Sequence, residues 1–128
     1  MPGTTIRMTA KKQMHLGHIH QKLCSIHEVE DVSKSENTVN GVTIWTLVFE
    51  KYYVRSDGYA SAVVVLTEYE QEQTACIVAS GASGRALNLT LGATRNFAKE
   101  FLKVLEECGF TLVESDLKKG SLLARIFE

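Results

Sequence analysis

The sequence predicts an α+β fold in which an antiparallel meander of four to five strands is packed on one face by two helices, with a short C-terminal strand or hairpin. Two observations carry this prediction. Apolar residues recur at spacings of three and four in two segments, as on the buried side of an amphipathic helix. Between them lie runs rich in β-branched and aromatic residues, and their short polar connections are typical of antiparallel neighbours.

The first helix is expected from about Lys11 to His27. Its apolar side is formed by four residues at helical spacing: Leu16, Ile19, Leu23 and Ile26. Residues 1–10 contain no continuous apolar stretch, so we expect a loose start to the chain and no signal peptide. A length of 128 residues without a recognisable linker predicts a single domain over 1–128.

Four strands are expected next, at residues 29–36, 42–53, 59–69 and 74–80. The dipeptides Asn40-Gly41 and Asp57-Gly58 favour the positive backbone angles of tight turns, and the polar residues 70–73 indicate a third turn. A glycine-containing segment at 80–85 then leads to residues 87–91, where leucines alternate with polar residues. This alternation predicts a fifth strand.

The second helix is expected after Thr94, which can cap its first turn. One stripe of this helix carries four apolar residues: Phe97, Phe101, Leu105 and Cys108. Gly109 stands where a helix commonly ends in a left-handed residue. Residues 110–114 and 121–127, separated by a polar turn, predict the terminal hairpin.

The composition excludes several classes of partner. Fourteen Lys and Arg against fifteen Asp and Glu give a net charge of -1, which argues against nucleic-acid and anionic-membrane binding. The three cysteines are odd in number and widely spaced, as expected for reduced thiols in the cytoplasm. No apolar run approaches the ~20 residues that span a bilayer. We therefore expect a cytoplasmic protein, and no motif predicts a resident cofactor.

The strand at 42–53 is apolar on both faces, whereas a strand with one wet face alternates apolar and polar residues. One face carries Trp45, Leu47 and Phe49. The other face carries Val42, Ile44 and Val48. Two helices cover one face of a sheet, so the second face needs the terminal hairpin, a cavity or another subunit. We expect a homo-oligomer or a small-ligand site, with Trp45, Leu47 and Phe49 as its interface or pocket.

The first helix carries a candidate metal site. His20, Cys24 and His27 fall within about 60° of one another on a helical wheel. Two imidazoles and a thiolate are suitable ligands for zinc or a similar ion. The alternative is that these residues form the polar rim of an amphipathic helix.

The segment SGASGR suggests an anion or ligand site at Ser80, Ser83 and Arg85. It has neither phosphate-loop nor nucleophile-elbow spacing, and the strand expected after Arg85 would leave no helix N-terminus to face an anion. The alternative is a turn that joins two strands. A small hydrolase or transferase using this turn is therefore the second functional hypothesis, behind a non-enzymatic binding or interaction module.

The central segment resembles a family of small bacterial proteins of unknown function, from TLVFEKYY through DGYASAVVVL to ACIVASGASGRALNLTLGATRNFAKEFL. The shared pattern is a serine-glycine turn, a strand, a glycine and an amphipathic helix, here at Ser80, Gly81, Ser83, Gly92 and Phe97. The resemblance covers roughly residues 42–108 and leaves the histidine-bearing helix outside. It implies one bacterial cytoplasmic domain and brings no established activity or catalytic residues.

Overall fold

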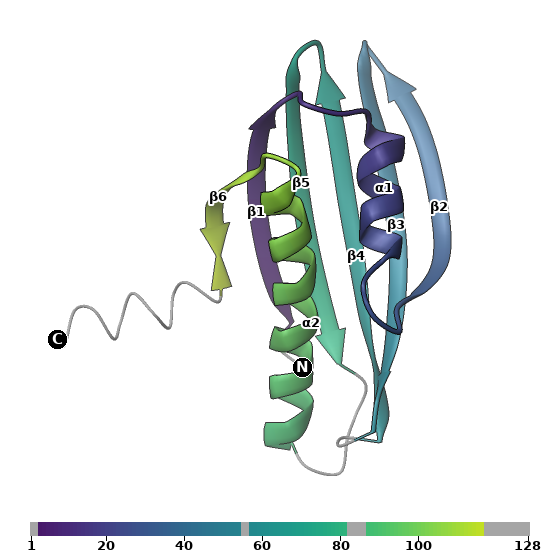
Figure 1. The fold of residues 1–128 in the computed structure, drawn as a ribbon, viewed down its shortest axis with the longest axis vertical. Helices are drawn as coiled ribbons and strands as arrows, with labels where there is room; N and C mark the ends of the chain where they lie inside the picture. The colour runs from purple at the N-terminus through teal and green to yellow at the C-terminus, as the bar shows by residue number, and fades with distance from the viewer. Residues whose placement is uncertain (1–2, 55–56, 82–86, 117–128) are drawn as a thin grey trace, which may run out of the picture.

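The fold is a six-stranded antiparallel sheet with two helices packed on one face, seen in a computed structural model that describes residues 3–54, 57–81 and 87–116. The elements in chain order are β1 (Thr4–Lys11), α1 (Leu16–Cys24), β2 (Glu30–Val39), β3 (Val42–Tyr53), β4 (Gly58–Tyr69), β5 (Glu72–Gly81), α2 (Leu87–Glu107) and β6 (Thr111–Ser115). The strand order is β2-β3-β4-β5-β1-β6. Both helices lie in front of the sheet in Figure 1, which confirms the predicted α+β class.

The meander from β2 to β5 follows the turn residues of the sequence. Asn40 (φ 52°) and Gly41 (φ 80°) both adopt positive φ, as a two-residue type I′ hairpin turn requires. Glu70 (φ 55°) takes the same region in the turn that joins β4 to β5. Because these turns are short, each strand pairs with the next one in the chain, as predicted.

Residues 4–10 are not loose, contrary to the expectation for residues 1–10. Thr4–Lys11 forms β1, an interior strand between β5 and β6. Its residues alternate between the two faces of the sheet, and the core side includes the fully buried Ile6 and Met8. Because its apolar residues alternate with polar ones, no continuous apolar run marks this strand in the sequence. The first helix is correspondingly shorter than predicted and begins at Leu16.

Residues 87–91 form the start of α2 rather than a fifth strand. Five residues are too few to separate a period of two from a period of 3.6, because Leu87 and Leu91 are also one helical turn apart. Leucine is a strong helix former, and this supports the helix. Thr94 is therefore buried inside α2 and is not its cap.

The end of α2 confirms the role predicted for Gly109. Its backbone N–H donates to the Glu106 carbonyl (3.0 Å), and the N–H of Phe110 donates to the Leu105 carbonyl (3.0 Å). With Gly109 at φ 96°, these two bonds make a Schellman motif. The following strand, β6, is the short C-terminal strand and pairs with β1. The expected second arm at 121–127 lies outside the described residues.

The core lies between the sheet and the helices. Its aromatic centre joins Phe49 of β3 to Phe101 of α2, with ring centroids 5.1 Å apart, and Phe101 to Phe97 at 4.9 Å. The predicted stripe of α2 is buried throughout, as are Leu16, Ile19 and Leu23 of α1. Lys51 Nζ lies 3.0 Å from the Glu100 carboxylate and so ties β3 to α2.

Candidate functional site

A cluster of three polar side chains lies where α1 meets β2. His20 and Cys24 are four residues apart, so the helix places them on one side, one turn from each other. The chain then reverses through Glu28 (φ 59°) and enters β2, which brings Asp31 back beside the helix. A β-bulge follows Asp31, since the pairing with β3 shifts between Asp31 and Ser33.

The three ligand-type atoms of this cluster converge on one point. His20 Nε2 is 3.1 Å from Asp31 Oδ2 and 3.4 Å from Cys24 Sγ, and Cys24 Sγ is 3.5 Å from Asp31 Oδ2. The His20 ring packs near two aromatic residues of β3, with centroids 6.1 Å from Trp45 and 6.2 Å from Phe49. The His20 side chain is 15% exposed and that of Asp31 is 39% exposed, so the cluster opens to solvent on the Asp31 side.

The electrostatics of the cluster do not favour a nucleophilic cysteine. Burial, the charge of Asp31 and the hydrogen bond to Asp31 together raise the pKa of Cys24 to about 11, so at neutral pH the thiol is protonated. A catalytic Cys–His–Asp set also needs the thiol and the acid on opposite ring nitrogens. Here both contact Nε2 of His20, so the cluster is not such a triad.

The structure brings together two of the three predicted metal-site residues. His20 and Cys24 adjoin, as the helical wheel predicts. His27 does not, because α1 ends at Cys24 and the wheel no longer applies beyond it. The His27 side chain is 85% exposed and lies 2.8 Å from Glu28. Asp31 is the third member of the cluster. Its position depends on where α1 ends and how the chain turns back into β2, and the residue spacing does not indicate either.

The interface predicted at Trp45, Leu47 and Phe49 is wrong in position. These residues point to the helix-covered side of β3, where Leu47 and Phe49 are fully buried and Trp45 packs against the core. They hold the helices on the sheet, so Leu47 and Phe49 are not accessible to a partner. The uncovered apolar face is the opposite one.

That opposite face carries a block of short, mostly β-branched side chains, which we call the open strip. Its residues come from adjacent positions of β3, β4 and β5: Ile44, Thr46, Val48, Val63, Val65, Thr67, Thr74, Cys76 and Val78. None carries a charge, and most are half-buried by their neighbours alone, while Val78 is 42% exposed. Among the described residues, no helix or strand lies over this strip.

Aromatic and charged side chains border the open strip. Tyr52 and Tyr59 pack edge to face at one end, with ring centroids 5.3 Å apart. Toward β1 and β6 the charges are paired: Arg7 lies 3.9 Å from Glu114, and a second ion pair joins β1 to β5. The strip is therefore an uncharged surface with paired charges along one side.

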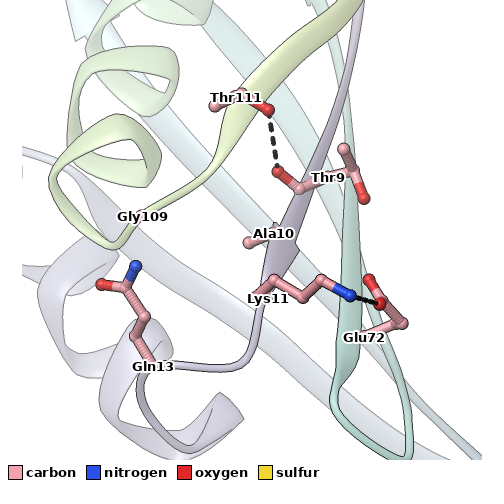
Figure 2. Close-up of a pocket in the computed structure, with 7 residues that line it drawn as sticks. All are labelled: Thr9, Ala10, Lys11, Gln13, Glu72, Gly109 and Thr111. Carbon is pink, nitrogen blue, oxygen red and sulfur yellow. Dashed lines mark hydrogen bonds and ion pairs between the residues drawn. The ribbon is translucent and has the colours of Figure 1, made fainter.

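A surface pocket of about 300 Å³ lies at the end of β1 (Figure 2). It is lined by Thr9, Ala10, Lys11, Gln13, Glu72, Gly109 and Thr111. Figure 2 shows the Gln13 carboxamide beside the Gly109 loop, and Lys11 paired with Glu72. Among these lining residues there is no histidine or cysteine. The Thr9 and Thr111 hydroxyls each donate to a backbone carbonyl, and Lys11 and Glu72 pair with each other, so no hydroxyl or amine of the pocket contacts a base that could activate it.

The predicted anion site is described only at its first residue. Ser80 is exposed near the end of β5, whereas Ser83 and Arg85 lie outside the described residues. The strand expected after Arg85 is wrong, because a helix begins at Leu87. The hydrolase or transferase hypothesis, which depends on this turn, gains no geometry from the described part of the chain.

The fold and its surfaces define an α+β protein with a helix-covered sheet face and an open one. The chain belongs to the family of unknown function DUF6054, which matches residues 1–109. This match extends the resemblance noted at 42–108 to include β1 and the histidine-bearing helix. No curated protein and no solved structure matches the chain. Neither described helix is both long and apolar enough to cross a membrane.

Proposed function

We propose that the protein is a non-enzymatic interaction module that self-associates, two copies packing face to face through the open strip. The observation that supports this is the uncharged, β-branched surface on the sheet face opposite the helices. Burial of apolar surface drives association, and contiguous exposed apolar patches commonly mark interaction sites. A two-fold arrangement would place each strip against its own copy.

The open strip is the centre of a larger open face. The strip covers five positions on each of three strands, which is about 14 Å by 17 Å for strands about 4.8 Å apart and a rise of about 3.3 Å per residue. The whole face of β2 to β5, with 10 to 12 residues per strand, presents about 19 Å by 33 Å, or about 600 Å² per copy. Two copies packed over the whole face would bury about 1,200 Å², the lower end of the range for stable interfaces.

The charges favour a second copy of the chain as the occupant. Arg7 and Glu114 are already paired within one chain, as are Lys11 and Glu72, so packing two strips together would bury no unpaired charge from these four. Glu50 lies on the same face just beyond Val48 and accepts from the Ser61 hydroxyl, so its carboxylate is the charge that a contact over the whole face would have to accommodate. A net charge of -1 gives little repulsion between copies.

The test is the oligomeric state of two lysine variants. Val78→Lys places a charge in the strip, while Val32→Lys places one on an exposed valine (51%) at the bulge of edge strand β2. We expect wild type and Val32→Lys to be dimers by sedimentation velocity and Val78→Lys to be a monomer. A monomeric wild type, or equal behaviour of the two variants, would contradict the proposal.

Cys76 provides a second readout because it lies within the strip. In a face-to-face dimer its alkylation should slow as protein concentration rises. In Val78→Lys this dependence on concentration should disappear. If the wild-type protein is monomeric and Cys76 is protected at every concentration, another segment of the same chain covers the strip. That result would overturn self-association.

A further inference from the structure

The donor atoms of His20, Cys24 and Asp31 form a triangle of the size that a tetrahedral ion requires. Its edges are 3.4 Å from sulfur to nitrogen, 3.5 Å from sulfur to oxygen and 3.1 Å from nitrogen to oxygen. For zinc, with bonds of about 2.3 Å to sulfur and about 2.1 Å to nitrogen and oxygen, the corresponding edges are about 3.6, 3.6 and 3.4 Å. Each observed edge is within about 0.3 Å of that value, so an ion needs only small outward shifts.

The three groups also contact one another in pairs. Asp31 Oδ2 accepts from the Cys24 thiol and lies against His20 Nε2, and the same Nε2 faces Cys24 Sγ. A cation at the centre of the triangle would accept a lone pair from all three atoms. It would replace these contacts and release the Cys24 proton, because a metal-bound cysteine is a thiolate.

The surroundings hold the three side chains in place. The His20 ring is fixed by Trp45 and Phe49 of β3, and Cys24 follows one helical turn later. Asp31 is placed by the chain reversal before β2 and by pairing opposite Phe49. Ligands supported by packed elements keep the geometry that metal binding needs.

We propose that His20, Cys24 and Asp31 bind one zinc-class divalent ion per chain, with a fourth position open to solvent. A thiolate and an imidazole select zinc or cobalt over magnesium or calcium, which prefer oxygen ligands. Three protein ligands leave one coordination position free, and the 39% exposure of Asp31 gives water or another donor access to it. No other cluster of three such groups with this spacing occurs among the described residues.

Cobalt(II) titration of the full-length chain, purified without a histidine tag and treated with chelator, tests the proposal. We expect one equivalent to give the intense visible bands of a tetrahedral cobalt ion and a sulfur-to-cobalt charge-transfer absorption, both abolished by one equivalent of zinc. Weak absorption of octahedral type, or no saturable binding, would overturn the proposal.

Matched substitutions locate the ion. His20→Gln and Cys24→Ser should each weaken cobalt binding by about a hundredfold or more, because loss of even an outer-shell partner costs about 10–100-fold. Cys24→Ser should also remove the charge-transfer band. The controls His27→Gln and Cys76→Ser alter the same residue types outside the cluster and should bind as wild type does. Equal loss in a control and its matched variant would refute the assignment.

The single tryptophan supplies an independent readout that does not depend on absorption bands. The Trp45 ring centroid is 6.1 Å from that of His20, so bound paramagnetic cobalt should quench its fluorescence and zinc should restore it. The open strip lies on the other face of β3, so Val78→Lys should keep this quenching. Cobalt bound without quenching would place the ion elsewhere and would contradict the site.

Discussion

Replacing Phe101 with alanine tests the docking of α2 on the sheet. Phe101 is fully buried and its ring contacts both Phe49 of β3 and Phe97 of its own helix. A second aromatic contact between the two layers joins Phe97 to Tyr53 of β3, with ring centroids 6.2 Å apart. The substitution removes both contacts of Phe101 together and leaves a cavity between the two layers.

The expected cost is about 3–5 kcal/mol, as for other buried phenylalanines replaced by alanine. The pair with Phe49 should account for about 0.5–1.5 kcal/mol of this beyond burial. Against a total stability of about 5–15 kcal/mol, the loss is a large fraction. With a urea dependence of about 2 kcal/mol per molar, a loss of 4 kcal/mol lowers the unfolding midpoint by about 2 M.

The assay is urea unfolding followed by fluorescence of Trp45 and by far-ultraviolet circular dichroism. Lys103→Ala, at an exposed position of the same helix, is the control and should change the stability by less than about 0.5 kcal/mol. A double-mutant cycle with Phe49→Leu and Phe101→Leu isolates the contact between the rings. A cost below about 1 kcal/mol for Phe101→Ala, or zero coupling in the cycle, would refute the packing of α2 described above.

Three further predictions follow from single residues. Gly109→Ala should destabilise the protein by about 1–2 kcal/mol, measured as a lower urea midpoint, because φ 96° is strained for any residue with a Cβ. Burial raises the pKa of Glu68. Hydrogen bonds from Gln73 and Lys12 and the charge of Lys12 lower it by more, so it lies below its ordinary 4.5. Glu68 therefore stabilises the fold above that pH and loses this effect as the pH falls through the folded pKa, so the stability difference between wild type and Glu68→Gln should shrink from pH 7 to pH 3. Asp31→Asn removes the carboxylate whose charge and hydrogen bond raise the pKa of Cys24. Iodoacetamide should therefore alkylate this thiol faster at pH 8, while the other two cysteines react at unchanged rates. An unchanged rate at Cys24 would contradict the contact.

The local parts of the fold could be predicted from the sequence, and the nonlocal parts could not. Asn and Gly favour the positive φ values that a two-residue hairpin turn requires, so Asn40-Gly41 predicts the β2–β3 hairpin from local sequence alone. β1 has partners only in distant segments, and no residue within Thr4–Lys11 indicates them. At residues 87–91 the pattern fits two periods equally, and leucine's helix propensity was the signal that could have decided between them.

The candidate sites show the same limit. His20 and Cys24 could be paired from spacing alone, whereas the position of Asp31 depends on a loop that reverses through a left-handed glutamate, Glu28. The choice of sheet face could not be made from β3, because both its faces are apolar. The helices cover Leu47 on one side and leave Val48 on the other, and either choice agrees with hydrophobicity.

The interior position of β1 has a consequence for biosynthesis. β1 pairs with β5, which begins 61 residues after Lys11, and with β6, where the Thr111 hydroxyl reaches back 102 residues to the Thr9 carbonyl. At about 5–20 residues per second, a ribosome needs about 5–20 s to make the intervening 102 residues. Of the six described strands, β1 leaves the ribosome before the others and is thus among the last to be fully paired. Until then its apolar side and the edge of β5 are open to chaperones or to another nascent chain.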